Sequence, residues 1–103
     1  MESIQSLIER LQKAGLVVQG SSIEKIGELM KNDRRPPGDQ IVALLSHGRG
    51  YGIYFYQDQA AFDRDEFIRT LGEAGLSSTQ AKAILGNLRC VPAPELSRVG
   101  DRD

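Results

Sequence analysis

A helix-ending pattern that occurs twice constrains the fold of this chain more than any other feature. The segments LQKAGL at 11–16 and LGEAGL at 71–76 each place Ala-Gly-Leu after an amphipathic run. The apolar residues of the first run recur at helical spacing, namely Ile4, Leu7, Ile8, Leu11 and Ala14. Glycine commonly closes a helix because it adopts left-handed backbone angles without strain. Each copy therefore predicts a helix, a tight turn and a second helix, which together form an αα-hairpin.

Capping residues predict where three of the helices begin. In each case Ser or Asp is followed three positions later by Glu or Gln: Ser21 and Glu24, Asp63 and Glu66, and Ser77 and Gln80. Phe62 and Phe67 also stand at the two positions of a hydrophobic staple around the second of these starts. Together with the amphipathic helix over 3–14, these patterns predict four helices.

The stretch IVALLSHGRGYGIYFYQ at 41–57 has a less determined structure. Its second half, 51–57, predicts a strand because aromatic residues and isoleucine dominate it. The segment 40–46 has two interpretations. It is either the matching strand of a hairpin or a helix that begins near Pro37 and ends at Gly48. We favour the strand, and the helix stays open.

These elements predict an α+β fold in which four helices, arranged as two αα-hairpins, surround a small antiparallel hairpin or sheet. The LVV segment at 16–18 is a candidate for one more short strand. If 38–46 is helical, the alternative is a winged-helix-like fold in which 51–57 forms the wing strand.

Length and composition are those of a single globular domain. The chain has 103 residues, 40% of them apolar and 26% charged, with a net charge of −1. We expect one compact domain over 1–91 and a polar C-terminal tail over 92–103, because Pro92 and Pro94 end regular structure. The N-terminus has no apolar signal core and no segment approaches the length of a membrane span. We therefore expect a cytoplasmic protein that does not contact a membrane.

Few residues of this chain could carry catalysis. The run ALLSHG, which contains His47, resembles the segment around the catalytic histidine of caspase-type cysteine proteases. That resemblance implies His47 as the base and Cys90 as the nucleophile. The segment NLRCVPAP, however, lacks the Gln-Ala-Cys signature of that family. Because no third group completes a catalytic set, we expect a non-enzymatic protein with no metal and no cofactor.

The aromatic strand predicts a surface for a protein partner. Successive side chains of a strand point to opposite faces, with Tyr51, Ile53 and Phe55 on one face and Tyr54 and Tyr56 on the other. If the first face meets the helices, the second is exposed near Arg49. Tyrosine and arginine are favoured at binding hot spots. We therefore predict a protein-interaction or regulatory module that binds a protein partner, or a second copy of itself, through Arg49, Tyr54 and Tyr56.

The alternative function is a nucleic-acid-binding transcriptional regulator. The segment SIEKIGEL at 22–29 resembles the first helix of the helix-turn-helix in bacterial DNA-binding regulators, which implies a helix-turn-helix or winged-helix protein. Its phosphate contacts would come from four basic residues, namely Lys31, Arg34, Arg35 and Arg49. This alternative predicts that the four side chains share one face and that binding weakens steeply with salt.

Overall fold

The computed structural model describes residues 2–91, which contain five α-helices, one 3-10 helix and three strands. In chain order the elements are α1 (Ile4–Lys13), β1 (Leu16–Gln19), α2 (Ile23–Leu29), α3 (Pro37–His47), η1 (Gly48–Tyr51), β2 (Tyr54–Asp58), α4 (Arg64–Glu73), α5 (Ser78–Asn87) and β3 (Arg89–Val91). The prediction of a small, compact α+β domain is confirmed. The predicted tail over 92–103 lies outside the described residues. Within residues 2–91, no helix is long and apolar enough to cross a membrane.

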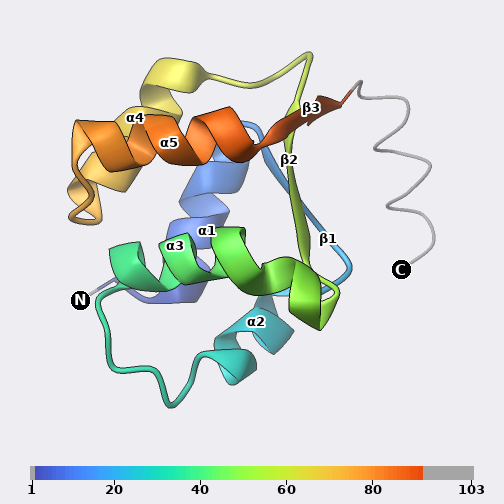
Figure 1. Cartoon of the computed structure of the whole chain (residues 1–103), viewed down its shortest axis with the longest axis vertical. Helices are drawn as coiled ribbons and strands as arrows, with labels where there is room; N and C mark the ends of the chain where they lie inside the picture. The colour runs from blue at the N-terminus through green and yellow to red at the C-terminus, as the bar shows by residue number, and fades with distance from the viewer. Residues whose placement is uncertain (1, 92–103) are drawn as a thin grey trace.

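The three strands form one mixed sheet with β2 in the centre (Figure 1). β1 pairs with β2 in antiparallel fashion, with Leu16 opposite Gln57 and Gln19 opposite Tyr54. β3 returns parallel to β2 after α4 and α5, and Arg89 lies opposite Tyr56. The helices lie on one side of the sheet, so that the described helices leave its other face uncovered.

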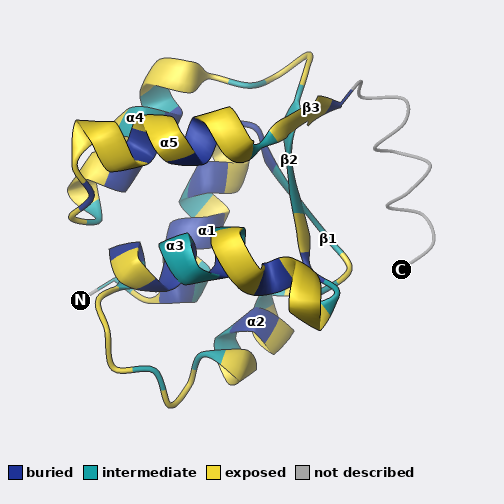
Figure 2. Ribbon diagram, in the orientation of Figure 1, coloured by how far each residue is buried: buried dark blue, intermediate teal, exposed yellow. Residues whose placement is uncertain are grey.

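The core is built around α1, which contacts β1, α2, α3 and α4. Its buried face carries the predicted apolar residues Ile4, Leu7, Ile8 and Leu11. Phe67 and Leu71 of α4 are completely buried beside them. Figure 2 shows this burial concentrated on the helices, whereas the strands are mainly half-buried or exposed.

The prediction of a strand over 40–46 is wrong, because α3 covers Pro37–His47. Proline is well suited to the first position of a helix, and Pro37 occupies it. The Gln40 side chain also donates hydrogen bonds to the carbonyl oxygens of Asp33 and Arg35, at 3.0 and 2.8 Å, which ties the preceding loop to the helix. The described residues consequently hold five helices rather than four, and the sheet is mixed rather than a simple antiparallel hairpin.

The helix starts follow the predicted caps in two of three cases. The side chain of Asp63 accepts a hydrogen bond from the Glu66 amide, and Ser77 forms the reciprocal capping box with Gln80. The rings of the predicted Phe62–Phe67 staple are 5.1 Å apart. In the third case the cap is Ser22 instead of Ser21, because its side chain is the one that accepts from the Lys25 amide.

The condition for the winged-helix alternative is met in part. A helix does precede the aromatic strand, as that alternative requires. However, β2 is the central strand and is followed by α4 and α5 instead of by the second strand of a wing.

Candidate functional site

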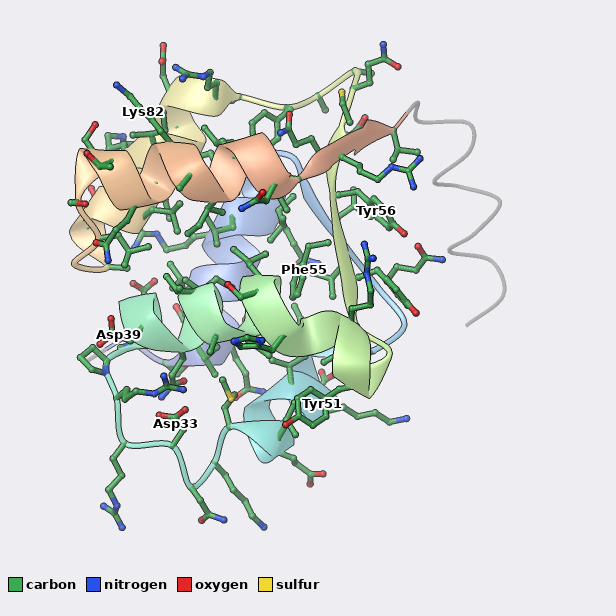
Figure 3. The ribbon with its side chains drawn as sticks, in the orientation of Figure 1. Asp33, Asp39, Tyr51, Phe55, Tyr56 and Lys82 are labelled. Atoms are coloured by element: carbon green, nitrogen blue, oxygen red, sulfur yellow. The ribbon has the colours of Figure 1, made fainter. Side chains whose placement is uncertain are left out.

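β2 presents two chemically different faces. Phe55 points toward the helices, whereas Tyr56 points away from them (Figure 3). Ile53, just before the strand, is buried, and Phe55 packs against the core. Tyr54 is 37% exposed and Tyr56 is half-buried. The predicted alternation of the aromatic residues is therefore present, except that Tyr51 belongs to η1 and is 66% exposed.

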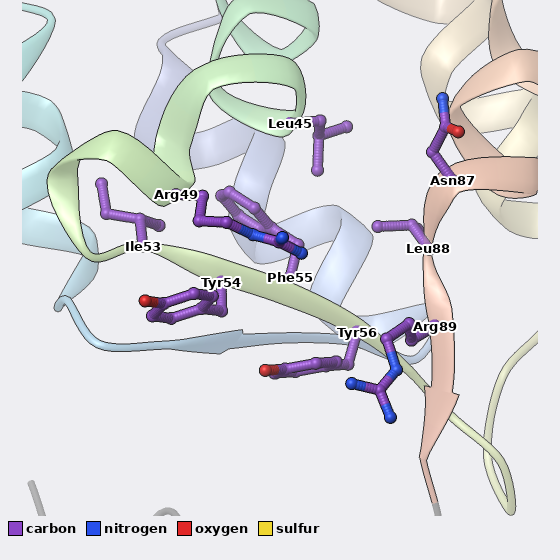
Figure 4. Close-up of a pocket in the computed structure, with 9 residues that line it drawn as sticks. All are labelled: Leu45, Arg49, Ile53, Tyr54, Phe55, Tyr56, Asn87, Leu88 and Arg89. Carbon is purple, nitrogen blue, oxygen red and sulfur yellow. The ribbon is translucent and has the colours of Figure 1, made fainter.

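A groove of about 450 Å³ lies beside β2, between η1 and the junction of α5 with β3 (Figure 4). Its floor is apolar and comes from residues that are buried or half-buried: Leu45, Ile53, Phe55 and Leu88. Its rim is polar and more exposed, and consists of Arg49, Tyr54, Tyr56, Asn87 and Arg89. We call this feature the β2 groove. Its volume lies in the range of about 300–1,000 Å³ that is typical of ligand sites.

Short-range hydrogen bonds fix one wall of the β2 groove. The 3-10 helix η1 carries Arg49, and the Ile53 amide donates to the Gly48 carbonyl at 2.9 Å. This bond joins the first residue of η1 to the residue that precedes β2. A Cβ atom at Gly48 would lie 3.3 Å from the Ile53 carbonyl oxygen, so the absence of a side chain there permits the close approach.

The opposite wall is held by one side chain from the inner face of the sheet. The Gln57 amide donates to the carbonyl oxygens of Leu85 and Leu88, at 3.1 and 3.2 Å. These carbonyls belong to the last turn of α5 and its C-cap, and the Leu85 carbonyl also accepts from the Leu88 amide at 3.2 Å. Gln57 thereby anchors the end of α5 beside β2 and sets the position of Leu88 and Arg89.

The arginines of the chain differ in their partners. Arg10, Arg35 and Arg69 donate side-chain hydrogen bonds to neighbouring carboxylates, and these bonds raise the pKa of each guanidinium. The bond from Arg35 also holds the pKa of Asp33 below its usual value. Within residues 2–91, neither Arg49 nor Arg89 forms an ion pair with a carboxylate. Among the described residues, the lining of the β2 groove therefore includes two guanidinium groups on the rim and no acidic side chain.

The predicted binding residues separate into two groups. Arg49, Tyr54 and Tyr56 line the β2 groove together. The other basic residues of the nucleic-acid alternative, Lys31, Arg34 and Arg35, line a different cavity that also includes Glu2 and Asp33. Arg49 is absent from the lining of that cavity, so the four basic residues do not share it.

His47 and Cys90 also occupy different parts of the fold. His47 ends α3 and lines a cavity between α2 and η1 that also includes the exposed Tyr51. Cys90 is exposed on β3, where it pairs with Gln57 near the far end of β2. In the described part of the chain, no three His, Cys, Asp or Glu residues are grouped so that they could hold a metal ion.

Sequence reasoning missed Arg89 and Leu88 as parts of the β2 groove. Both follow α5, more than thirty positions after Tyr54, and they reach the groove only because β3 pairs in parallel with β2. No local motif marks such a long-range pairing. Comparisons of the chain with family models, with curated proteins and with solved structures found no match.

Proposed function

We propose that this chain is a non-enzymatic protein-interaction module that binds a partner protein through the β2 groove. The observation that carries the proposal is the composition of this one surface: Arg49, Tyr54 and Tyr56 lie around an apolar floor beside β2, between η1 and the start of β3. Tyrosine and arginine supply large contact areas and several hydrogen-bond donors, and both are enriched at the energetic centres of protein interfaces.

The organisation of the groove resembles the layout of a small binding site. An apolar floor provides the area that is removed from water on binding, and polar rim groups orient the ligand. Two rigid walls, fixed by the Gly48–Ile53 and Gln57–Leu88 hydrogen bonds, keep the rim residues in place before a partner arrives. Such preorganisation reduces the entropy lost on binding.

Nucleic-acid binding is the less supported function. α3, which would be the recognition helix, contains no lysine or arginine between Pro37 and His47. Arg35 is engaged by Asp33, and Arg49 lines a separate cavity from Lys31 and Arg34. A charge of −1 over the chain provides no general attraction for a phosphate backbone.

Selection from a random peptide library displayed on phage tests the proposal. The full chain is immobilised, and the selected clones are then tested against the double variant Tyr54→Ser/Tyr56→Ser. Tyr51→Ser is the matched control, because Tyr51 is also an exposed tyrosine but does not line the β2 groove. We expect clones that bind the wild type and the control equally and lose most of their binding to the double variant. The proposal would be contradicted if no clones are enriched, or if the enriched clones bind the double variant as well as they bind the wild type.

Size-exclusion chromatography with light scattering tests whether the partner is a different protein or a second copy of the chain. A partner-binding module elutes as a monomer in the absence of peptide. A dimer that dissociates in the Tyr54→Ser/Tyr56→Ser variant would identify the second copy as the occupant of the groove.

A further inference from the structure

The edge of β2 that faces away from β1 is paired with another strand over only part of its length. Backbone groups alternate along a strand, and the Asp58 amide donates to Gly15 on the β1 side while the Gln59 amide donates to Val91 on the β3 side. The same alternation turns the amides of Ile53 and Phe55 toward the β3 side. Ile53 donates to Gly48, whereas β3 begins only opposite Tyr56. Among residues 2–91, no strand residue therefore pairs with Phe55 on the edge that forms the floor of the β2 groove.

Two cationic side chains belong to the rim of the β2 groove. Arg49 comes from η1 and Arg89 from the start of β3, and both line the same groove as Phe55. Figure 4 shows the Arg49 side chain extending over the inner side of β2, while the Arg89 guanidinium lies beside the ring of Tyr56. A backbone N–H and two guanidinium groups around one cavity favour a ligand with negatively charged oxygens, since hydrogen bonds to ionised acceptors are the strong ones.

The apolar residues of the lining indicate which class of ligand carries the negative charge. Leu45, Phe55 and Leu88 offer an apolar floor, which a free inorganic anion could not use. A single strand of nucleic acid would need a track of positive charge along its backbone, and the described part of the groove offers only two cations. A carboxylate flanked by apolar side chains satisfies both the rim and the floor.

Resting on the proposed function, we propose that the β2 groove binds an extended acidic segment of a partner protein, whose Asp or Glu carboxylate lies between Arg49 and Arg89. An extended chain also presents backbone carbonyl oxygens along its edge, and one of these accepts a hydrogen bond from the Phe55 amide. This is a short form of strand addition, in which main-chain bonds supply affinity and side-chain contacts supply specificity.

Three pools of synthetic nine-residue peptides test this inference. In every peptide, apolar residues occupy alternate positions on both sides of a central residue, and this central residue is varied. The first pool has Asp or Glu at the centre and blocked termini, the second has Asn or Gln with blocked termini, and the third has Asn or Gln with a free C-terminal carboxylate. Binding to the full chain is followed by amide NMR shifts and by hydrogen exchange of the Phe55 amide.

We expect the first pool to bind at least about tenfold more tightly than the second, since only its members complete the charge pairs. Phe55 exchange should slow in the complex. Arg49→Gln and Arg89→Gln should each weaken binding several-fold, while Arg34→Gln, the same charge change outside the groove, should leave it unchanged. Added salt should weaken the first pool more than the second.

Equal binding by the first two pools would overturn the inference, and so would a preference for the third pool, which would indicate a chain terminus instead of an acidic side chain. If phage clones bind the β2 groove without any acidic residue, the inference fails while the proposed function stands. If no peptide of any kind binds at the groove, the proposed function itself fails.

Discussion

Alanine substitution of three glycines tests whether the backbone after β1 lies in close contact with the backbone before β2. Gly20 follows β1 with a φ of +89°, and a Cβ atom there would lie 2.0 Å from the carbonyl oxygen of Gly52. Gly52 has a φ of +76°, but its added Cβ would have no neighbour within 4 Å. Gly72 lies within α4, where an added Cβ also meets nothing.

The expected effects differ in sign and size. Gly52→Ala should cost about 1–2 kcal/mol of unfolding free energy, because an L-residue is forced into the left-handed region. Gly20→Ala carries the same backbone cost and must in addition displace a backbone carbonyl; adding about 1–3 kcal/mol for overpacking gives about 2–5 kcal/mol. Gly72→Ala should instead stabilise the protein by about 0.5–1 kcal/mol, because alanine is the better helix former.

Urea unfolding of the wild type and the three variants, followed by circular dichroism, provides the comparison. With a common slope, the midpoints should rank Gly72→Ala above the wild type, then Gly52→Ala, then Gly20→Ala. An equal loss of unfolding free energy in Gly20→Ala and Gly52→Ala would refute the close approach of the two backbones. Since the Cβ added at Gly20 would also lie 3.6 Å from the Tyr54 ring, that result would revise the position of the binding rim as well.

Three further predictions concern the core, a helix cap and a surface carboxylate. Phe67→Ala should lower the unfolding free energy by about 3–5 kcal/mol, because the completely buried ring leaves a cavity; a loss under 1 kcal/mol in urea unfolding would mean that the ring is not in the core. Ser77→Ala should cost about 1 kcal/mol by removing the capping box of α5, and an unchanged urea midpoint would contradict that geometry. Asp33 should titrate below the usual aspartate pKa in an NMR pH series, and Arg35→Gln should return its midpoint toward the usual value. Because folding lowers the pKa of Asp33, the pairing with Arg35 stabilises the protein above the unfolded-state pKa, and this stabilisation is lost as the pH falls through the folded-state pKa. An Asp33 midpoint that does not move in Arg35→Gln would contradict the pairing.

The elements that could be predicted from the sequence are those that local chemistry decides. The start of α4 follows from the cap at Asp63 and the neighbouring phenylalanine pair, which involve residues within one helical turn. The opposite orientations of Phe55 and Tyr56 follow from the two-residue period of a strand. These features depend little on the rest of the chain.

The elements that could not be predicted from the sequence depend on long-range packing. The segment 40–46 is apolar enough for a buried strand or a buried helix, and its helical state depends on packing against α1 and on the Gln40 bonds to the preceding loop. β3 is only three residues long and exists through its pairing with β2. Arg89 therefore enters the candidate site through topology, and no spacing within the sequence indicates it.

The measurement that tests the central claim most directly is an NMR titration of the labelled full chain with a peptide selected from the phage library. The amide signals should shift most at Arg49, at Tyr54 to Tyr56 and at Leu88 and Arg89, which line the β2 groove. Tyr51→Ser should leave these shifts unchanged, because that exposed tyrosine lies at the other cavity. Shifts centred on Leu29, His47 and Tyr51 would place binding between α2 and η1 and would contradict the account.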